Sequence, residues 1–168
     1  MSRGARALTA ARVTPWLIRG IVVITALALA ADTLLYSSIA PLVPTYVHRF
    51  GLSKTQAGVL VGAYAAGMMV GALPLGFAAA RAGAKRTLLF GLVLLIVAST
   101  GFGLATTAAM LDITRTIQGV GGAGMWAGAL VWLTETGGAE RRGELIGIGV
   151  GAAVAGQVLG PALARNVQ

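Results

Sequence analysis

The stretch R-T-I-Q-G-V-G-G-A-G-M-W, residues 115–126, decides the fold. Gly119, Gly121 and Gly124 stand in the G-x-G-x-x-G spacing of a dinucleotide-binding loop, which needs a strand before it and a helix after it. Residues 111–118 carry two charges and an amide and match a buried strand poorly. The glycines lie instead inside a long apolar run, where small residues let membrane helices approach closely. We therefore interpret them as helix-packing positions and not as a nucleotide site.

The composition indicates a membrane protein. Hydrophobic residues make up 57% of the 168 residues and charged residues 11%, whereas a soluble globular chain is about 25% charged. The net charge of +8 would suit nucleic-acid binding, but the basic residues lie between apolar runs rather than on one helical face. We therefore predict membrane-flanking charges and no nucleic-acid partner.

The chemistry-bearing residues do not indicate an enzyme. There is no cysteine, and the single histidine, His48, lies in a predicted loop, so we predict no metal site. Paired carboxylates at catalytic spacing, a Ser/His/Asp set and a phosphate-binding loop are all absent from the sequence. We expect neither enzymatic activity nor a cofactor.

Five apolar spans follow one another along the chain, and each has the roughly 20 residues that a membrane helix needs. They predict an all-α integral membrane protein with five transmembrane helices, comprising an N-terminal tail at residues 1–17 and a helical bundle at 18–168. The predicted spans are residues 18–43, 55–80, 87–106, 109–133 and 145–164.

The charges between the spans predict the orientation, because cytoplasmic loops carry an excess of Lys and Arg. Three basic residues fall on one side of the membrane, namely Arg49, Lys54 and Arg165. Nine fall on the other side, namely Arg3, Arg6, Arg12, Arg19, Arg81, Lys85, Arg86, Arg141 and Arg142. We predict a multi-pass protein of the cytoplasmic (inner) membrane with a cytoplasmic N-terminus.

A cleavable secretory signal is the rival interpretation of the first span. Residues 21–30 follow Arg19 and end in A-L-A, as a signal with its cleavage site does. The apolar run continues to Val43, however, and four more spans follow, which favours a membrane helix.

Asp32 lies near the middle of the first span, where a charge costs about 2.5–3.5 kcal/mol and faces a bundle interior or a water-filled cavity. One interpretation is a proton- or cation-coupling site. The other interpretation is that Asp32 is a structural partner of Arg115 or of a backbone dipole. By helix rise, Arg115 is roughly 9 Å and Asp32 roughly 16 Å below the outer surface, so a direct or water-bridged contact is feasible.

Two more polar residues share the helix with Arg115. Asp112 lies one turn away and competes with Asp32 as a partner for Arg115, and Gln118 lies one turn to the other side. This polar strip indicates a cavity wall or a structural clamp between helices, and the sequence leaves both interpretations open.

Small residues also recur at four-residue spacing in the second and fifth spans, which predicts a tightly packed bundle. The runs are Gly58, Gly62 and Ala66, then Gly67 and Gly71, and Gly143, Gly147, Gly151 and Ala155, then Gly156 and Gly160.

Four local patterns together resemble the N-terminal part of a major facilitator superfamily transporter, especially its drug/proton antiporter branch. They are G-F-A-A-A-R-A-G-A-K-R at residues 76–86, R-T-I-Q-G-V-G-G-A at 115–123, G-Q-V-L-G-P at 156–161 and D-T-L-L-Y-S-S-I-A-P at 32–41. Their order and spacing agree with that family along nearly the whole chain.

The resemblance implies roles for these residues. The arginine motif places Arg115 in proton coupling, with Asp32 as the acid of the first helix. Ala80 stands where the family has an acid that steadies the outward-facing state, and Ala84 replaces a basic residue, which puts gating by the loop in doubt. The implied gate loop is Gly76, Arg81, Gly83, Lys85 and Arg86, and the implied antiporter helix bend is Gly156, Gly160 and Pro161.

The family has two six-helix halves with the substrate site between them. Five helices correspond to an incomplete N-terminal half, so the resemblance implies part of a proton-coupled transporter, with efflux of small molecules as the expected activity. The expected partners are the lipid bilayer, protons, a small-molecule substrate and a missing C-terminal half or another subunit. Tyr36, Tyr64 and Trp126 are candidate cavity-lining aromatics, with packing or interfacial roles as alternatives.

Two other interpretations of the whole chain stay open. It is a truncated, non-transporting membrane protein whose helices only pack, or it is one piece of a split or oligomeric transporter.

Overall fold

The computed structural model describes residues 15–165, which form helices throughout, with no strand in that range. The helices are α2 (Pro15–Ser37), α3 (Ile39–Phe50), α4 (Lys54–Ala82), α5 (Ala84–Gly103) and α6 (Ala108–Arg165). Most of the predicted tail, including Arg3, Arg6 and Arg12, lies outside the described residues.

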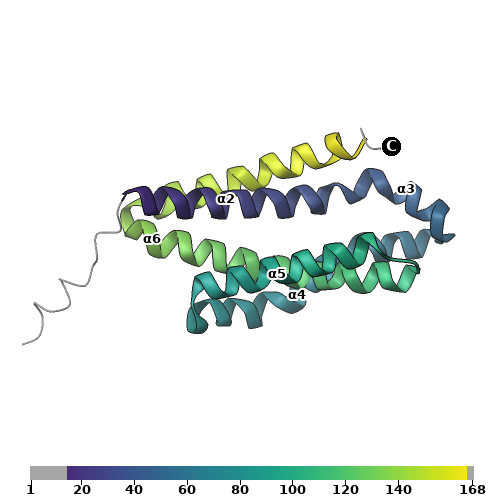
Figure 1. Ribbon diagram of the computed structural model, residues 1–168, viewed down its shortest axis with the longest axis horizontal. Coiled ribbons are helices and arrows are strands. Elements are labelled where there is room, and N and C mark those ends of the chain that lie inside the picture. The colour runs from purple at the N-terminus through teal and green to yellow at the C-terminus, as the bar shows by residue number, and fades with distance from the viewer. Residues whose placement is uncertain (1–14, 166–168) are drawn as a thin grey trace, which may run out of the picture.

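Helix α6 is two limbs joined at one glycine. Gly138 has φ 65° and ψ −176°, and it is the residue inside α6 with non-helical backbone angles. We call residues 108–137 the first limb and residues 139–165 the second limb; Figure 1 shows them folded back on each other. The predicted loop between the fourth and fifth spans is therefore helical on both sides of a one-residue reversal, which glycine permits because it has no Cβ.

Four helices are long and apolar enough to cross a membrane, and the bent α6 supplies both of the last two predicted spans, which confirms the predicted fold class.

The first predicted span proved to be two helices. Ser38 separates α2 from α3, and Pro41 lies in the first turn of α3, where a missing N–H costs no helical hydrogen bond. The helix then continues to Phe50 and ends at Gly51, which has φ 63°. His48, which we predicted in a loop, is therefore in the last turn of α3.

The predicted gate loop is also mostly helical. Gly83, with φ 102°, is the single residue between α4 and α5. Gly76 and Arg81 lie in α4, and Lys85 and Arg86 lie in the first turn of α5. The connection between the two helices is shorter than the six residues between the predicted spans, because one glycine with positive φ suffices to reverse the chain.

The helices form two layers (Figure 1). Helices α4 and α5 pack on the first limb of α6, while α2 packs on the second limb. Glycines make both contacts close: a side chain at Gly119 would collide with the Tyr64 carbonyl of α4, and one at Gly156 with the Ala30 carbonyl of α2. A Cβ at Gly121 would lie 3.0 Å from the Gly91 carbonyl oxygen of α5, which is a tight contact. The glycines of the opening stretch are therefore helix-packing positions, as predicted.

The glycine stripes serve this packing in part. Gly67 and Gly71 lie against α6, and Gly156 and Gly160 lie against α2. A side chain would meet no atom within 4 Å at the remaining stripe positions, which are Gly58, Gly62, Gly143, Gly147 and Gly151.

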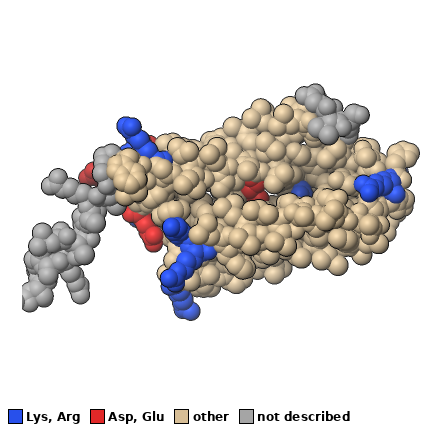
Figure 2. Space-filling view, viewed as in Figure 1, with Lys and Arg blue, Asp and Glu red and all other residues tan. Residues whose placement is uncertain are grey.

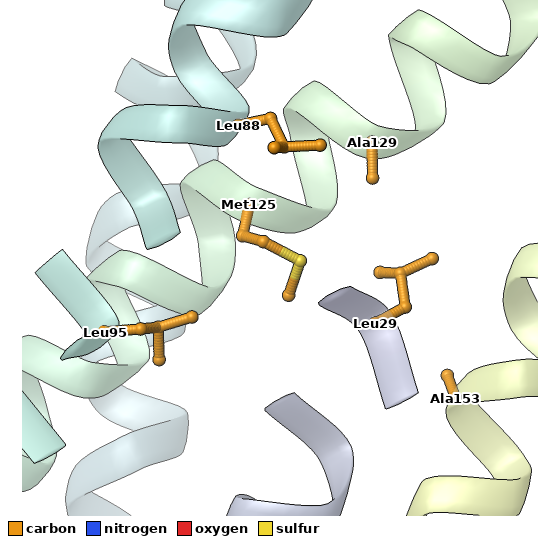
Figure 3. Packing of buried hydrophobic residues seen from close by; sticks show 6 residues of the cluster. All are labelled: Leu29, Leu88, Leu95, Met125, Ala129 and Ala153. Carbon is orange, nitrogen blue, oxygen red and sulfur yellow. The ribbon is translucent and has the colours of Figure 1, made fainter. Parts of the chain in front are cut away.

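Large apolar side chains cover the outside, as expected of helices in lipid. Met69 and Leu73 on α4 are 79% and 74% exposed. Figure 2 shows charged atoms gathered toward the two ends, with a recessed acidic patch and a basic patch about midway. The interior cluster between the layers includes Leu29 of α2 and Met125 of the first limb, which point toward each other in Figure 3.

Candidate functional site

Asp32 is buried between the two layers. It lies on α2, and its side chain is 4% exposed. The Tyr64 hydroxyl on α4 lies 2.8 Å from Oδ1 and 2.9 Å from Oδ2, and it donates to the carboxylate. Trp126 Nε1 on the first limb donates to Oδ2 at 3.0 Å. Two neutral donors from two other helices therefore hold the carboxylate inside the bundle.

Arg115 is buried beside this group, with 2% of its surface exposed. Its Nη1 donates to Gln118 Oε1 at 2.9 Å and its Nη2 to the Tyr36 carbonyl of α2 at 3.0 Å. Its Nε has no hydrogen-bond partner among the described residues. The guanidinium lies 5.1 Å from the centre of the Tyr64 ring and 5.6 Å from that of Tyr36, so aromatic faces supply much of its surroundings.

The direct Asp32–Arg115 contact that we considered does not form. Within the described part of the chain, Arg115 makes no ion pair with a carboxylate. Tyr64 touches both groups instead, with its hydroxyl on Asp32 and its ring beneath the guanidinium. The acid and the base are therefore connected through a tyrosine rather than through an ion pair.

The predicted polar strip divides at Arg115. Gln118 stays with it and extends the network to α5, because its Nε2 donates to Ser99 Oγ at 3.1 Å. Asp112 is half-buried, and its carboxylate does not pair with Arg115; its backbone carbonyl accepts a bond from Thr116 Oγ1. Asp112 is thus not the competing partner that its spacing indicated.

A pocket of ≈270 Å³ opens beside Asp32. Its wall includes all three candidate aromatics, Tyr36, Tyr64 and Trp126. Sequence reasoning did not single out Thr33, Ala65, Met68 and Gln157, which complete the lining. Gln157 falls inside the quoted pattern at residues 156–161. A polar residue between two packed glycines was the sequence feature that could have identified it as a lining residue.

A second hollow of ≈300 Å³ reaches Asp32 from the other side, between α2 and α5. It is mostly aliphatic, with Ser99 and Thr100 as its hydroxyl-bearing walls. Asp32 therefore borders two separate hollows.

Close glycine contacts create the room for the site. A Cβ at Gly122 would collide with the Tyr64 hydroxyl and lie 3.5 Å from Asp32 Oδ1. The close contact of Gly119 with the Tyr64 carbonyl fixes the position of Tyr64 relative to the first limb of α6. The glycine-rich stretch therefore holds the tyrosine that donates to Asp32.

The candidate antiporter segment lies along α2, next to the pocket. A side chain at Gly160 would collide with the Ser37 hydroxyl. Thr33 Oγ1 donates to the Ala153 carbonyl at 2.6 Å, and Ser38 Oγ to the Gly160 carbonyl at 3.2 Å. Backbone angles stay helical through this segment, so the bend at Pro161 stays a prediction.

None of the five predicted gate residues lines the ≈270 Å³ pocket beside Asp32. They cluster at the α4–α5 turn, where the Arg81 guanidinium lies 5.9 Å from the Phe77 ring centre.

One ion pair lies at the reversal of α6, outside the predicted spans. Arg141 donates two hydrogen bonds to Glu144, each of 2.9 Å. These bonds lower the pKa of the exposed Glu144 carboxyl below its ordinary value.

Comparison with known proteins gives the family. The sequence matches the Major Facilitator Superfamily over residues 25–165, which is most of the chain. The chain belongs to this superfamily. The predicted resemblance is thereby confirmed at the level of the superfamily, whereas the drug/proton antiporter branch stays a prediction. Membership and the long apolar helices identify a multi-pass membrane protein in a transporter superfamily rather than an enzyme.

Individual superfamily relatives are moderately similar. The chain is 28% identical over 143 residues to the MFS-type transporter ppzB of Metarhizium rileyi (strain RCEF 4871), covering 82% of this chain and 30% of that protein. It is 29% identical over 142 residues to the uncharacterized MFS-type transporter C18.02 of Schizosaccharomyces pombe (strain 972 / ATCC 24843), covering 81% and 32%. It is 33% identical over 111 residues to a chloramphenicol resistance protein of Streptomyces lividans, covering 66% and 28%. The chain thus spans about a third of the length of the curated relatives it matches.

Proposed function

We propose that this chain is the N-terminal part of a proton-coupled transporter that exports small molecules. The observation that carries the proposal is the buried Asp32 carboxylate, which borders a pocket and is held by Tyr64 and Trp126 rather than by an ion pair. Ionisable groups inside membrane segments are costly, so they mark ion and substrate pathways by default.

The geometry gives each residue a part. A carboxylate held by two neutral donors can take up a proton or a cationic group without first breaking a salt bridge. Arg115 sits one tyrosine away, with its guanidinium 5.1 Å from the centre of the Tyr64 ring. A proton and a substrate that compete for one carboxylate are coupled to each other, because occupancy by one lowers the affinity for the other.

The relatives support transport, and one supports export. Two relatives are named as MFS-type transporters, and the Streptomyces lividans relative is named for resistance to chloramphenicol. Of the three candidate aromatics, Tyr36 and Tyr64 already lie against Arg115, which leaves Trp126 as the aromatic for contact with a substrate. The substrate class we propose is therefore small and amphipathic.

The test is proton-driven efflux in everted membrane vesicles that contain the gene's natural product, with chloramphenicol and ethidium as probes. Asp32→Asn should abolish proton-coupled efflux, since it removes the titratable group and keeps a similar shape. Asp112→Asn is the matched control, because it removes a carboxylate that does not contact Tyr64 or Arg115, and it should retain efflux. Wild-type efflux in Asp32→Asn would overturn the proposal. Vesicles in which the unmutated protein moves neither probe would support the packing-only interpretation.

We place the protein in the cytoplasmic membrane with its N-terminus inside, on the strength of the basic residues at the α4–α5 turn and the α6 reversal. The chain has no cysteine, so a single cysteine introduced at Arg142 or at Lys54 reports its own side. In intact cells an impermeant maleimide should label Lys54→Cys and not Arg142→Cys, and the reverse result would invert the topology.

The gate residues at the α4–α5 turn complete the proposal. In this assignment they contact the remaining part of the transporter from the cytoplasmic side, without the acid that Ala80 replaces. A C-terminal half or another subunit would supply the opposite wall of the substrate pathway.

A further inference from the structure

A hollow of ≈450 Å³ lies at the end of the molecule where α2 begins beside the reversal of α6, at the left of Figure 1. It is separate from both hollows that reach Asp32. Its walls are the first turns of α2 and the start of the second limb. Five aliphatic residues and two arginines line it, namely Ile18, Val22, Val23, Leu145, Ile148, Arg19 and Arg141.

The hollow sits at the level of the lipid headgroups. Arg19 precedes Asp32 by 13 residues, which is about 20 Å along a helix, and Asp32 lies near the middle of its span. Trp16, in the first turn of α2, is exposed, and exposed tryptophan is typical of the membrane–water interface. The arginines therefore stand at the interface, with aliphatic side chains continuing toward the hydrocarbon.

The charged residues that line this hollow are both positive. Arg19 and Arg141 face it from two different helices, and no acidic residue is part of its described lining. Arg19 makes no ion pair with any of the described residues. Arg141 is engaged by Glu144, which lies on its own helix and outside the hollow. Two guanidinium groups across one hollow repel each other unless an anion lies between them.

We propose that this hollow binds an anionic phospholipid, with Arg19 and Arg141 on the phosphate and one acyl chain along the aliphatic wall. Guanidinium groups bind phosphate oxygens through paired N–H donors, which makes arginine the better match to a phosphate than a point charge. The aliphatic wall adds contact that a free phosphate cannot use, so the occupant is a lipid and not a soluble anion. This inference is independent of proton coupling at Asp32.

Native mass spectrometry of the full chain in neutral detergent tests the assignment. Phosphatidylglycerol and phosphatidylcholine with the same acyl chains are titrated in turn, and phosphatidylglycerol should be retained more strongly. Arg19→Gln and Arg141→Gln should each weaken phosphatidylglycerol binding about fivefold, which is the effect expected of one interfacial basic residue. Glu144→Gln should strengthen it, because it releases Arg141.

Arg142→Gln is the matched control, since Arg142 is the exposed neighbour of Arg141 and does not line the hollow. An equal loss in Arg142→Gln would show a general surface-charge effect and overturn the site. Equal retention of the two lipids would also overturn it, as would displacement of phosphatidylglycerol by millimolar inorganic phosphate. If a glutamine variant fails to fold, the gain expected in Glu144→Gln still decides, and no gain contradicts the proposal.

Discussion

The first limb of α6 has two interfaces, and they differ in whether backbone or side-chain atoms make the contact. Against α4 and α5 it packs backbone to backbone through glycines such as Gly67, Gly91 and Gly119. Against α2 it makes contacts between side chains: its Trp126 indole donates to the Asp32 carboxylate, and its Met125 shares a buried cluster with Leu29. The first interface brings backbones into contact, whereas the second lies beside Asp32, which borders one hollow lined partly by α4 and another lined by α2 and α5.

The difference shows where this fold keeps its adjustable contacts. Backbone contacts through glycine allow one relative position of the two helices, whereas side chains at a contact can change rotamer and hydration. The layer of α4, α5 and the first limb, and the pair of α2 with the second limb, are therefore the two tightly packed units. Asp32 lies at the seam between them, where side chains rather than backbones make the contacts.

The largest expected effect comes from breaking a glycine contact. Gly67→Leu drives a side chain into the Thr116 carbonyl, which cannot move aside as a flexible side chain can. We expect a loss of about 3 kcal/mol or more of unfolding free energy, measured by tryptophan fluorescence during titration of micelles with sodium dodecyl sulfate. Gly58→Leu on the same helix meets no atom within 4 Å and should be near neutral. Equal losses in the two variants would show that close approach is not what Gly67 provides.

A smaller effect is expected at the seam. Tyr64→Phe removes one of the two donors of Asp32 and leaves the ring on Arg115. It should cost about 1.5–3 kcal/mol in the same titration, the range for a hydrogen bond to a carboxylate. The control is Tyr46→Phe, whose ring packs on Phe50 and Phe102 and whose hydroxyl makes no hydrogen bond within the described residues. A loss in Tyr64→Phe no larger than that of the control would mean that the hydroxyl does not stabilise the seam.

The smallest effect concerns the pair formed by α2 and the second limb. Thr33→Val removes the 2.6 Å bond to the Ala153 carbonyl and should cost about 0.6 kcal/mol, the average for such bonds in membrane proteins. Thr100→Val loses only a bond to the Ile96 carbonyl of its own helix and should cost less. If the order is reversed, glycine packing alone joins α2 to the second limb.

The sequence predicts the helices better than the turns between them. Runs such as residues 55–80 are apolar for a whole membrane thickness, and that length leaves few alternatives to a helix. The turns were predicted too long because charges near Gly83 and Gly138 look like solvated loops, whereas one glycine with positive φ reverses the chain at each point. The break at Ser38 was missed because residues 18–43 are apolar across it.

The site was predicted as a set of residues and not as a network. Asp32 and Arg115 stand out from sequence because charges in apolar spans are rare. Their mediator, Tyr64, is set by how α4 packs against Gly119 and Gly122, which no local pattern encodes. Asp112 looked like a partner of Arg115 from helical spacing, but the side chain of Arg115 turns to Gln118 and to α2.

The separation of Asp32 from its donors has a consequence for biosynthesis. Tyr64 lies 32 residues and Trp126 94 residues after Asp32 along the chain. At translation rates of roughly 5–20 residues per second, Trp126 emerges about 5–19 s after Asp32. During that interval the first helix carries an acid that lacks first both donors and then Trp126 alone, against an insertion cost of about 2.5–3.5 kcal/mol for a charge. The first helix should therefore stay beside the insertion machinery until the later helices arrive, and its lateral release should follow the synthesis of α6.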